Sequence, residues 1–444
     1  MKRVDVLIIG GSAAGITAAL TARRFSKEAS ITLIRREKEV LVPCGIPYIF
    51  QTIGDVKKNL IPDGVLLNKN IEILVDEAVD INRAEKTVTL KSGEKIGYGK
   101  LVLATGSNPV VPKIKGIELQ NIYTIKKDVE YLARLSAEID KAKNVVIIGG
   151  GFIGVEVADD LSKKGLNISI IEMLPHCLQL AFDEEFYTLA EENLRNLKVN
   201  LVTGTTAEEF IGKEKVEGVK LSNGETLKAD LVIIAIGTYP NTELAQKAGL
   251  KIGEQKGIWV DEYMRTVDED IFAAGDCAEK TSFFTGKPTA LRLASLATME
   301  ARVAGANVYS LKRKNPGAIG SFSTMVGGLA LGVAGLTENA AKQAGFNYVI
   351  GEFAGPDRHP PVMPGCRELR VKLLFDKSSG KLLGGQVAGG ASTAEIVNML
   401  TVMISRGFTV EETAIMQFGT HPALTCSPIS YPVSSAAEDA LSKF

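Results

Sequence analysis

Residues 144–173, NVVIIGGGFIGVEVADDLSKKGLNISIIEM, decide the fold of this chain. An apolar, β-branched run ends in glycines, apolar residues then recur at helical spacing, and a second apolar run closes the segment. This order predicts a strand, a tight turn, a helix and a second strand, which together form a βαβ unit. The order also occurs near the start of the chain, where VDVLIIGG (4–11) and GITAALTARRFSK (15–27) precede ASITLIRRE (29–37). Two copies so far apart do not stack on one another as repeats, so we expect two separate α/β domains.

The glycines of residues 149–154 form a complete dinucleotide-binding fingerprint. A glycine turn between a strand and a helix presents free N–H groups at the helix N-terminus to a diphosphate. Glu172 ends the following strand, where a carboxylate accepts hydrogen bonds from both hydroxyls of an adenosine ribose and repels a 2′-phosphate. We therefore expect NADH at this site, with NADPH as the alternative. The predicted contacts are Gly149, Gly151, Phe152, Ile153, Gly154 and Glu172.

The first glycine turn, GGSAAG (10–15), has serine at the middle position of the fingerprint. Ser12 is small enough to let a diphosphate approach the backbone, and a sharp βα turn without a ligand is the alternative interpretation. The ribose contact is less clear here, because the first acid after the strand is Glu37. Arg35 is predicted either to lie near adenine or phosphate oxygens or to be a solvated surface charge. The predicted contacts are Gly10, Ser12, Ala13, Ala14, Gly15, Arg35 and Glu37.

Three further segments each end an apolar strand with a glycine turn. They are KLVLATGSNPVVP (100–112), KADLVIIAIGTYPNTEL (228–244) and TVDEDIFAAGDCAE (266–279). In the last of them a carboxylate projects from the turn, where it can accept hydrogen bonds from a polyol chain, although Gly-Asp alone is common turn chemistry. The predicted contacts are Thr105, Gly106, Gly237, Gly275 and Asp276.

Composition limits the classes of function. A chain of 444 residues needs more than one hydrophobic core. Its 51 Lys+Arg and 52 Asp+Glu give a net charge of -1, which offers no electrostatic basis for nucleic acid or an anionic membrane as the main partner. No apolar stretch is long enough to span a bilayer. The five cysteines are widely spaced and do not resemble a secreted disulfide framework, so we expect a cytoplasmic protein, and we predict no metal site.

These motifs, in this order, resemble those of the two-dinucleotide-binding-domain flavoprotein disulfide reductases. GGSAAG, ATGSNP, GGGFIGVE, AIGTYPN and AAGDCAE extend over nearly the whole chain and are jointly specific. The resemblance implies FAD bound by two sequence-distant segments, an inserted NAD domain and a C-terminal dimerisation domain. A family glutamate at the position of Glu156 lies near the flavin and the nicotinamide. The alternative interpretation of Glu156 is an exposed acid in the first turn of a helix.

The implied fold class is α/β, with two Rossmann-like dinucleotide-binding domains of the glutathione reductase type and a C-terminal α+β dimerisation domain. In the C-terminal part, RELRVKLLFD and KLLGGQVAGG predict antiparallel strands, and TAEIVNMLTVMISRGF (393–408) predicts a helix. The predicted domains are residues 1–112 (FAD-binding, first part), 113–241 (NAD-binding), 242–320 (FAD-binding, second part) and 321–444 (dimerisation).

Residues 42–48, VPCGIPY, narrow the resemblance to one branch of the family. Members similar to glutathione reductase carry two redox cysteines in a CxxxxC spacing, but the residues five positions from Cys44 are Glu39 and Ile49. The segment instead resembles the single-cysteine branch of coenzyme A-disulfide reductases, NADH oxidases, NADH peroxidases and archaeal NAD(P)H sulfur oxidoreductases. Cys44 precedes IPYIFQTI (46–53), for which we expect a helix whose N-terminus stabilises a thiolate. A buried structural cysteine is the alternative interpretation.

Several positions bear on the electron acceptor. Oxidases and peroxidases of the branch commonly carry a histidine where this chain has Ala13, which favours a sulfur substrate. Residues 362–363 are Val-Met where coenzyme A-disulfide reductases usually have tyrosines, which weakens the case for coenzyme A itself. His421 resembles the histidine that protonates a leaving thiolate across the dimer interface of two-cysteine reductases, and a packed interface residue is the alternative. We also hypothesise that Cys426 of one subunit resolves a mixed disulfide on Cys44 of the other. The remaining cysteines are predicted to be packing residues: Cys177, Cys277 and Cys366.

The predicted activity transfers electrons from NADH through FAD to a sulfur substrate (coenzyme A disulfide, a persulfide or a polysulfide) at Cys44. One alternative is an NADH oxidase that reduces O2 to water or peroxide. The other is an electron-transfer flavoprotein subunit that serves a partner protein. We expect a homodimer or a larger homo-oligomer.

Overall fold

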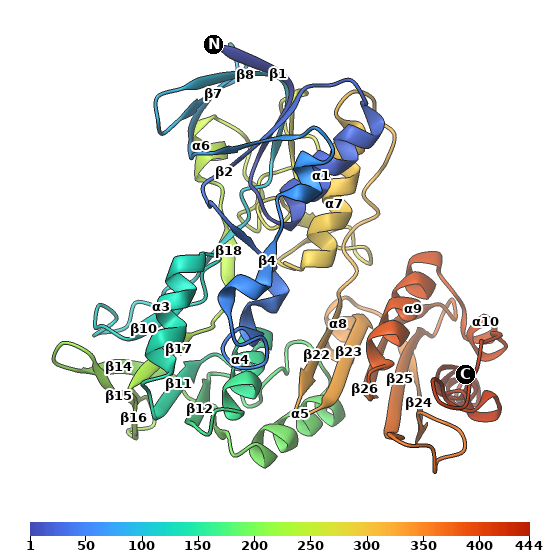
Figure 1. Cartoon of the computed structure of the whole chain (residues 1–444). Coiled ribbons are helices and arrows are strands. Elements are labelled where there is room, and N and C mark those ends of the chain that lie inside the picture. The colour runs from blue at the N-terminus through green and yellow to red at the C-terminus, as the bar shows by residue number, and fades with distance from the viewer. The chain divides into compact units, whose positions relative to one another are not determined.

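The computed structural model describes residues 1–444, which divide into two compact units. Each unit is assembled from segments that are distant in the sequence (Figure 1). Unit 1 comprises Met1–Pro112, Tyr123–Lys141 and Ile236–Ala318, and unit 2 comprises Lys113–Ile122, Ala142–Ala235 and Ile319–Phe444.

Unit 1 is built on one seven-stranded sheet in the order β5-β2-β1-β8-β7-β6, with β19 also paired to β8. The strands β5, β2, β1, β8 and β19 run parallel to their neighbours, whereas β7 and β6 continue the sheet as an antiparallel hairpin. The strands are β1 (Lys2–Ile9), β2 (Ile31–Arg35), β5 (Glu72–Val75), β6 (Ala78–Asn82), β7 (Thr87–Leu90), β8 (Lys95–Leu103) and β19 (Ile271–Ala273).

Helices α1 and α7 pack against each other although they lie far apart in the sequence (Figure 1). Apolar strand residues such as Leu7, Val102 and Ile271 are fully buried, and each such side chain stabilises the fold by roughly 1.5–3 kcal/mol. The helices of unit 1 are α1 (Ala13–Phe25), α2 (Gly64–Leu67), α3 (Val129–Ile139), α6 (Glu243–Lys247) and α7 (Ala294–Asn307), with 3₁₀ segments at Pro43–Tyr48 and Val56–Asn59. Its short strand pairs are β3 (Val40–Leu41) with β4 (Leu60–Ile61), β9 (Ser107–Pro109) with β18 (Thr238–Pro240), and β20 (Lys280–Thr281) with β21 (Pro288–Thr289).

Unit 2 contains a second parallel sheet, in which β17, β11, β12 and β13 are neighbours in that order. Its strands are β11 (Asn144–Ile148), β12 (Asn167–Glu172), β13 (Asn200–Thr203) and β17 (Leu231–Ile234). The short strand β10 (Ile122–Thr124) contains the sequence boundary between the two units, which falls after Ile122. A small antiparallel sheet is formed by β14 (Ala207–Gly212), β15 (Val216–Leu221) and β16 (Thr226–Lys228). The helices of this part are α4 (Phe152–Ser162) and α5 (Glu184–Asn196).

The C-terminal part of unit 2 is a five-stranded antiparallel sheet in the order β22-β23-β26-β25-β24. Its strands are β22 (Ser321–Val326), β23 (Leu329–Gly335), β24 (Tyr348–Pro356), β25 (Glu368–Asp376) and β26 (Leu382–Gly389). Its helices are α8 (Glu338–Gln343), α9 (Thr393–Arg406), α10 (Val410–Ala414) and α11 (Pro432–Leu441), with a 3₁₀ turn at Pro428–Ser430. The predicted strands and the helix of this part are confirmed.

Two Rossmann-like parallel sheets and one antiparallel C-terminal sheet confirm the predicted fold class. The four residue boundaries predicted for the domains make a finer claim and stay predictions. None of the helices combines the length and the hydrophobicity that crossing a bilayer requires.

One local prediction was wrong. The expected helix over residues 46–53 is a short 3₁₀ segment, Pro43–Tyr48, that contains Cys44 in its first turn and is followed by turns. Pro47 has no N–H to donate to the carbonyl four residues earlier, and the N–H groups of Gly45 and Ile49 instead bond to carbonyls three residues back.

Candidate functional site: nucleotide turns and a redox cysteine

The predicted FAD-binding turns of unit 1 lie at one edge of its parallel sheet. The last residue of β1, Ile9, pairs with Leu103 at the end of β8, and Leu103 pairs with Ala273 at the end of β19. The turns that follow these three strands are therefore neighbours. Ligands of open α/β sheets bind outside the carboxyl ends of the strands, so this arrangement provides one elongated binding edge.

The glycine turn after β1 is shaped by close backbone contacts. A Cβ on Gly10, whose φ is +121°, would lie 2.0 Å from the Ala104 carbonyl oxygen, and one on Gly15 would lie 1.8 Å from the Gly10 oxygen. Ser12 is the N-cap of α1, and its side chain makes no capping hydrogen bond. Helix α1 begins with Ala13 and Ala14, and the Ser12 side chain does not bond to the first N–H groups of this helix. These N–H groups can therefore donate to the diphosphate of FAD.

The two proline-punctuated segments that follow β8 and β17 are joined in unit 1. The Thr105 hydroxyl donates to the carbonyl of Asn241 at 2.6 Å, and the Asn241 N–H donates to the carbonyl of Gly106 at 2.9 Å. The Val110 N–H donates to the Gly237 carbonyl at 3.0 Å, beside the antiparallel β9–β18 pair. The structure therefore brings together two predicted turns that are more than a hundred residues apart in the chain.

The Asp276 carboxylate is fixed at the turn after β19. The Ser107 hydroxyl donates to its Oδ2 at 2.8 Å, and the ammonium of Lys127 lies 3.9 Å from the same oxygen. Behind the turn, a buried ion pair between Lys280 and Glu300 (2.9 Å) contacts the backbone. Sequence reasoning missed this pair, because its two members lie in different elements and no local spacing connects them.

The two candidates for the adenosine end of the FAD site lie in different environments. Arg35 is only 4% exposed and makes a bidentate pair with Asp63, so the interpretation of Arg35 as a solvated surface charge was wrong. Glu37 lies beyond the strand, where its carboxylate is 3.6 Å from the guanidinium of the exposed Arg36. Sequence reasoning missed Asp63, which carries no motif of its own.

Cys44 lies exposed on a loop that a buried side chain holds in place. The Asn59 side-chain amide donates to the Val42 carbonyl at 3.0 Å, and the Val42 N–H donates to the Asn59 carbonyl at 2.9 Å. A Cβ on Gly45 would lie 2.1 Å from Asn59 Oδ1, so a larger residue beside the cysteine would displace the Asn59 side chain. None of the five cysteines forms a disulfide, and Cys177, Cys277 and Cys426 are buried while Cys366 is partly exposed.

The predicted NAD-binding turn of unit 2 follows β11 and lies beside the carboxylate of Glu172. A Cβ on Gly151 would meet no atom within 4 Å, so the space above the turn is open to a diphosphate. Glu172 accepts hydrogen bonds from the N–H groups of Gly150 (2.6 Å) and Leu174 (2.8 Å), which fix its carboxylate beside the turn. Gly149, Gly154 and the first two residues of α4, Phe152 and Ile153, complete the predicted set.

Glu156 is a largely buried carboxyl group on α4. Burial raises its pKa to about 7, against the opposing effect of a hydrogen bond that the Thr324 hydroxyl donates to Oε1 at 2.9 Å. Thr324 lies on β22 of the C-terminal sheet, in the same unit as α4. The alternative interpretation of Glu156 as an exposed helical acid was therefore wrong. A carboxyl group with a pKa near neutrality can gain and lose a proton at working pH.

His421 and Cys426 lie in one loop of unit 2 but in different surroundings. The His421 ring is exposed, and its Nδ1 accepts the Ala423 N–H at 3.2 Å, which leaves Nε2 as the protonated nitrogen of the neutral ring. Cys426 is 3% exposed, and burial raises its pKa to about 11. A neutral thiol is a poor nucleophile, so a resolving role for Cys426 stays a prediction that requires its thiol to become exposed.

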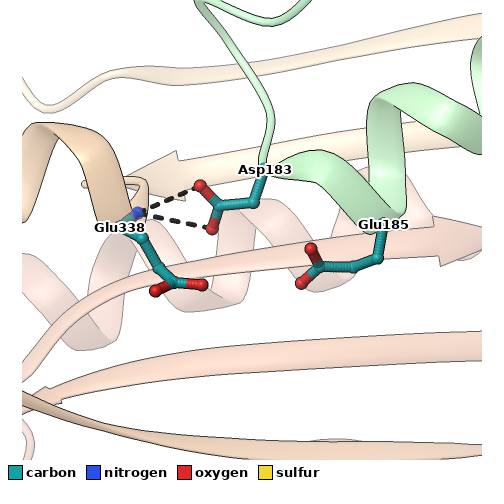
Figure 2. Close-up of side chains that lie close together, drawn as sticks. All are labelled: Asp183, Glu185 and Glu338. Atoms are coloured by element: carbon teal, nitrogen blue, oxygen red, sulfur yellow. Dashed lines mark hydrogen bonds between the residues drawn. The ribbon is translucent and has the colours of Figure 1, made fainter.

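One group of carboxylates, Asp183, Glu185 and Glu338, has the spacing of a metal site (Figure 2). The group surrounds the ammonium of Lys372, which lies 3.2 Å from Asp183 and 2.6 Å from Glu338 and also bonds to Glu185. Burial alone lowers the pKa of Lys372, but the hydrogen bonds that its ammonium donates to Glu185 and Glu338 outweigh burial and raise the pKa above its usual value. The ammonium of Lys372 therefore occupies the place of a cation among these three carboxylates and offsets part of their charge.

The chain is similar to known proteins over nearly its whole length. The family model described as pyridine nucleotide-disulphide oxidoreductase matches residues 4–301, and the model of the dimerisation domain of the same family matches residues 321–428. An "NADH oxidase" of Methanocaldococcus jannaschii is 34% identical, over 98% of this chain and 98% of that protein. A "NAD(P)H coenzyme A polysulfide/persulfide reductase" of Pyrococcus horikoshii is 34% identical, over 93% of both chains. Among solved structures, a NAD-dependent persulfide reductase from A. fulgidus superposes with a TM-score of 0.92 at 34% identity, covering 99% of this chain and 83% of that one.

Proposed function

The chain belongs to the pyridine nucleotide-disulphide oxidoreductase family, and on this premise we propose that it transfers electrons from NADH through FAD to a sulfur substrate at Cys44. It is an FAD-dependent NAD(P)H oxidoreductase of the disulfide reductase and NADH oxidase type. The observation that carries the proposal is the exposed thiol of Cys44, which unit 1 holds on a clamped loop together with the predicted FAD turns. The other cysteine of that unit, Cys277, is buried, and its thiol donates to backbone carbonyls.

The reaction assigned to Cys44 needs no second cysteine. Its thiolate attacks one sulfur of a disulfide, persulfide or polysulfide, a mixed disulfide forms on Cys44, and the other sulfur leaves as a thiolate or hydrosulfide. Bound FAD supplies the redox chemistry, accepting a hydride from NADH and passing an electron pair to sulfur. Two electrons cleave the mixed disulfide and return Cys44 to the thiolate.

Residues of unit 2 contribute nucleotide selection and a proton. The Glu172 carboxylate beside the NAD turn supports a preference for NADH, because it would repel a 2′-phosphate. The Nε2–H of the neutral His421 ring would donate a hydrogen bond to a leaving thiolate, and the imidazolium form would donate its proton to that thiolate.

Assembly as a homodimer or larger homo-oligomer belongs to the same proposal. Large apolar side chains of the C-terminal part are exposed, among them Val362 (86%), Leu424 (69%) and Ile429 (95%). Exposed apolar groups of this kind mark surfaces that associate, and the matched dimerisation-domain model covers Val362 and Leu424 and ends one residue before Ile429. A reducing cytoplasm is the compartment that suits a free, reactive thiol.

The proposal is tested with Cys44→Ser and, as a matched control, Cys366→Ser, which removes a partly exposed cysteine from the other unit. Anaerobic NADH oxidation is followed with coenzyme A disulfide, a coenzyme A persulfide and polysulfide as acceptors. Cys44→Ser is expected to retain FAD and to be reduced by NADH, but to lose turnover with all three sulfur acceptors. Sulfur turnover that persists in Cys44→Ser refutes the proposal.

The relative named NADH oxidase makes oxygen the second candidate acceptor. NADH consumption in air by the wild type, measured together with the peroxide formed, separates the two candidates. Oxygen turnover faster than turnover with every sulfur acceptor, dependent on Cys44 and yielding water, would assign the oxidase function instead.

A further inference from the structure

The two nucleotide turns of this chain can be compared residue by residue through their strand registers. In unit 2 the Gly149 N–H donates to the carbonyl of Ile171 at 2.8 Å, and the next residue along β12 is Glu172. The side chain of Glu172 lies against the turn, because a Cβ on Gly150 would be 3.1 Å from its Cβ and 3.2 Å from its Cγ. This is the position at which a dinucleotide fold contacts the adenosine ribose.

Unit 1 repeats this geometry with another residue. The Gly10 N–H donates to the carbonyl of Ile34 at 2.9 Å, and the next residue along β2 is Arg35. A Cβ on Gly11 would lie 2.7 Å from both Cβ and Cδ of Arg35. Arg35, and not Glu37, is therefore the counterpart of Glu172.

The Arg35 guanidinium donates hydrogen bonds to the carboxylate of Asp63 and to the backbone carbonyl of Lys38. Its Nη1 and Nη2 donate to the two carboxylate oxygens of Asp63 at 2.6 and 2.8 Å, and Nη2 also donates to the Lys38 carbonyl at 2.8 Å. Its Nε is buried and has no hydrogen-bond partner. The Asp63 side chain is 41% exposed, so its carboxylate keeps acceptor capacity toward solvent while both oxygens bind the arginine.

We propose that the Arg35–Asp63 pair forms the adenosine-ribose subsite of the FAD site. Asp63 supplies the carboxylate that accepts from the ribose hydroxyls, and the buried Arg35 holds that carboxylate in place at the end of β2. The pair has no net charge, so it adds no negative charge beside the FAD diphosphate, whereas a lone carboxylate would. The subsite concerns cofactor binding and is independent of which acceptor reacts at Cys44.

The alternative role of the pair is to fasten the Asp63 loop to the sheet without contacting the cofactor. The two roles differ in their response to the 2′-hydroxyl of the ribose. We therefore compare ADP with 2′-deoxy-ADP as competitors of FAD. FAD is added back to the flavin-depleted protein, and its displacement by each nucleotide is followed by flavin fluorescence. Because the signal comes from FAD, binding of either nucleotide to the NAD site does not enter the measurement.

The wild type is expected to bind ADP roughly tenfold or more tightly than 2′-deoxy-ADP, because a hydrogen bond to a charged acceptor is lost with the hydroxyl. In Asp63→Asn this ratio is expected to fall to near one. The double variant Arg35→Met/Asp63→Leu, which leaves no unpaired buried charge, should show the same loss and guards against a folding defect in the single variant. The control Asp261→Asn disrupts another Arg–Asp pair of unit 1, that with Arg265, and should keep the wild-type ratio.

A wild type that binds both nucleotides equally, or an Asp63→Asn variant that keeps the full preference for ADP, overturns the proposal. The same holds if Glu37→Gln, rather than Asp63→Asn, removes the preference. Failure of sulfur turnover in any of these variants does not bear on the ratio, so the two proposals are tested separately.

Discussion

The buried ion pair behind the Asp276 turn allows a quantitative test of how unit 1 holds FAD. The Lys280 and Glu300 side chains are 3% and 1% exposed. Glu300 Oε2 accepts from the Gly275 N–H at 2.9 Å, and the Lys280 ammonium donates to Glu300, to the Gly275 carbonyl and to the Ala278 carbonyl. The pair thus binds the turn from both its N–H and its carbonyl side, so Lys280→Met should loosen the backbone that presents Asp276.

The magnitude follows from the charge that Lys280→Met leaves behind. Removing one partner of a buried pair destabilises a protein by about 3–5 kcal/mol, whereas replacing both partners with apolar groups is often neutral. Burial already raises the pKa of Glu300 to about 6 although the charge of Lys280 lowers it, so loss of Lys280 should raise the pKa further. A carboxyl group whose folded pKa is raised stabilises the fold at low pH, and this contribution is lost as the pH rises through the folded pKa. Lys280→Met should therefore be most destabilising at pH 8 and less so at pH 5.5.

A loss of this size lowers the melting temperature of unit 1 by about 10 °C. The assay is thermal unfolding at both pH values, followed by the release of FAD fluorescence and by the single tryptophan, Trp259, which lies in unit 1. The double variant Lys280→Met/Glu300→Met should recover most of the loss. Lys314→Met, which breaks the exposed pair with Glu262, serves as the matched control and should not shift the transition measurably. A double variant that is no more stable than Lys280→Met at pH 8 would refute the reasoning.

Two further predictions concern the other unit and the redox loop. Glu156→Gln removes a carboxyl group whose folded pKa is raised to about 7, so the stability of this variant relative to wild type should improve by roughly 3 kcal/mol between pH 5 and pH 9. Thr324→Val removes a hydrogen bond that lowers this pKa, so the midpoint of the pH dependence should move to higher pH. Thermal melts of the flavin-free proteins measure both effects, and a stability difference that does not vary with pH contradicts the assignment. Gly45→Ala places a Cβ 2.1 Å from Asn59 Oδ1, which should destabilise the loop by about 1–3 kcal/mol and change the rate at which iodoacetamide alkylates Cys44. Adding Asn59→Ala in the same chain should restore space for this Cβ. Unchanged alkylation in Gly45→Ala would show that Asn59 does not position the thiol.

The parts of the fold and site that could be predicted from the sequence are those that short-range backbone geometry determines. A strand followed by Gly10 or Gly149 must turn sharply, and the helix that follows can approach only where Gly15 or Gly154 replaces a larger residue. The contacts of Gly15 with Gly10 and of Gly154 with Gly149 act within six residues, so the sequence pattern contains them. The positions of both nucleotide turns followed from them.

The parts that could not be predicted depend on pairs formed across the fold. Arg35 was ambiguous because its burial depends on Asp63, which approaches from another segment. The pKa of Glu156 likewise depends on the fold, because burial raises it and the hydrogen bond from Thr324 of the C-terminal sheet lowers it. The helix expected after Cys44 failed for a local reason, since a proline that is tolerated in a first turn still removes one hydrogen bond from a six-residue segment.

The residues held by backbone geometry differ from the exposed loop residues in how freely they can change. The groups predicted to hold FAD and NADH are buried or fixed by the backbone: Gly10 lies against Ala104, and Glu172 bonds to two N–H groups. The groups expected to meet the acceptor, Cys44 and His421, are exposed and lie on short loops. Substitutions on such loops change substrate contacts without disturbing the sheets, which explains how relatives of about equal identity bear the names NADH oxidase and persulfide reductase. If the acceptor of this chain reacts at Cys44 as proposed, its identity depends on the residues around that thiol and not on the fold that the chain shares with both relatives.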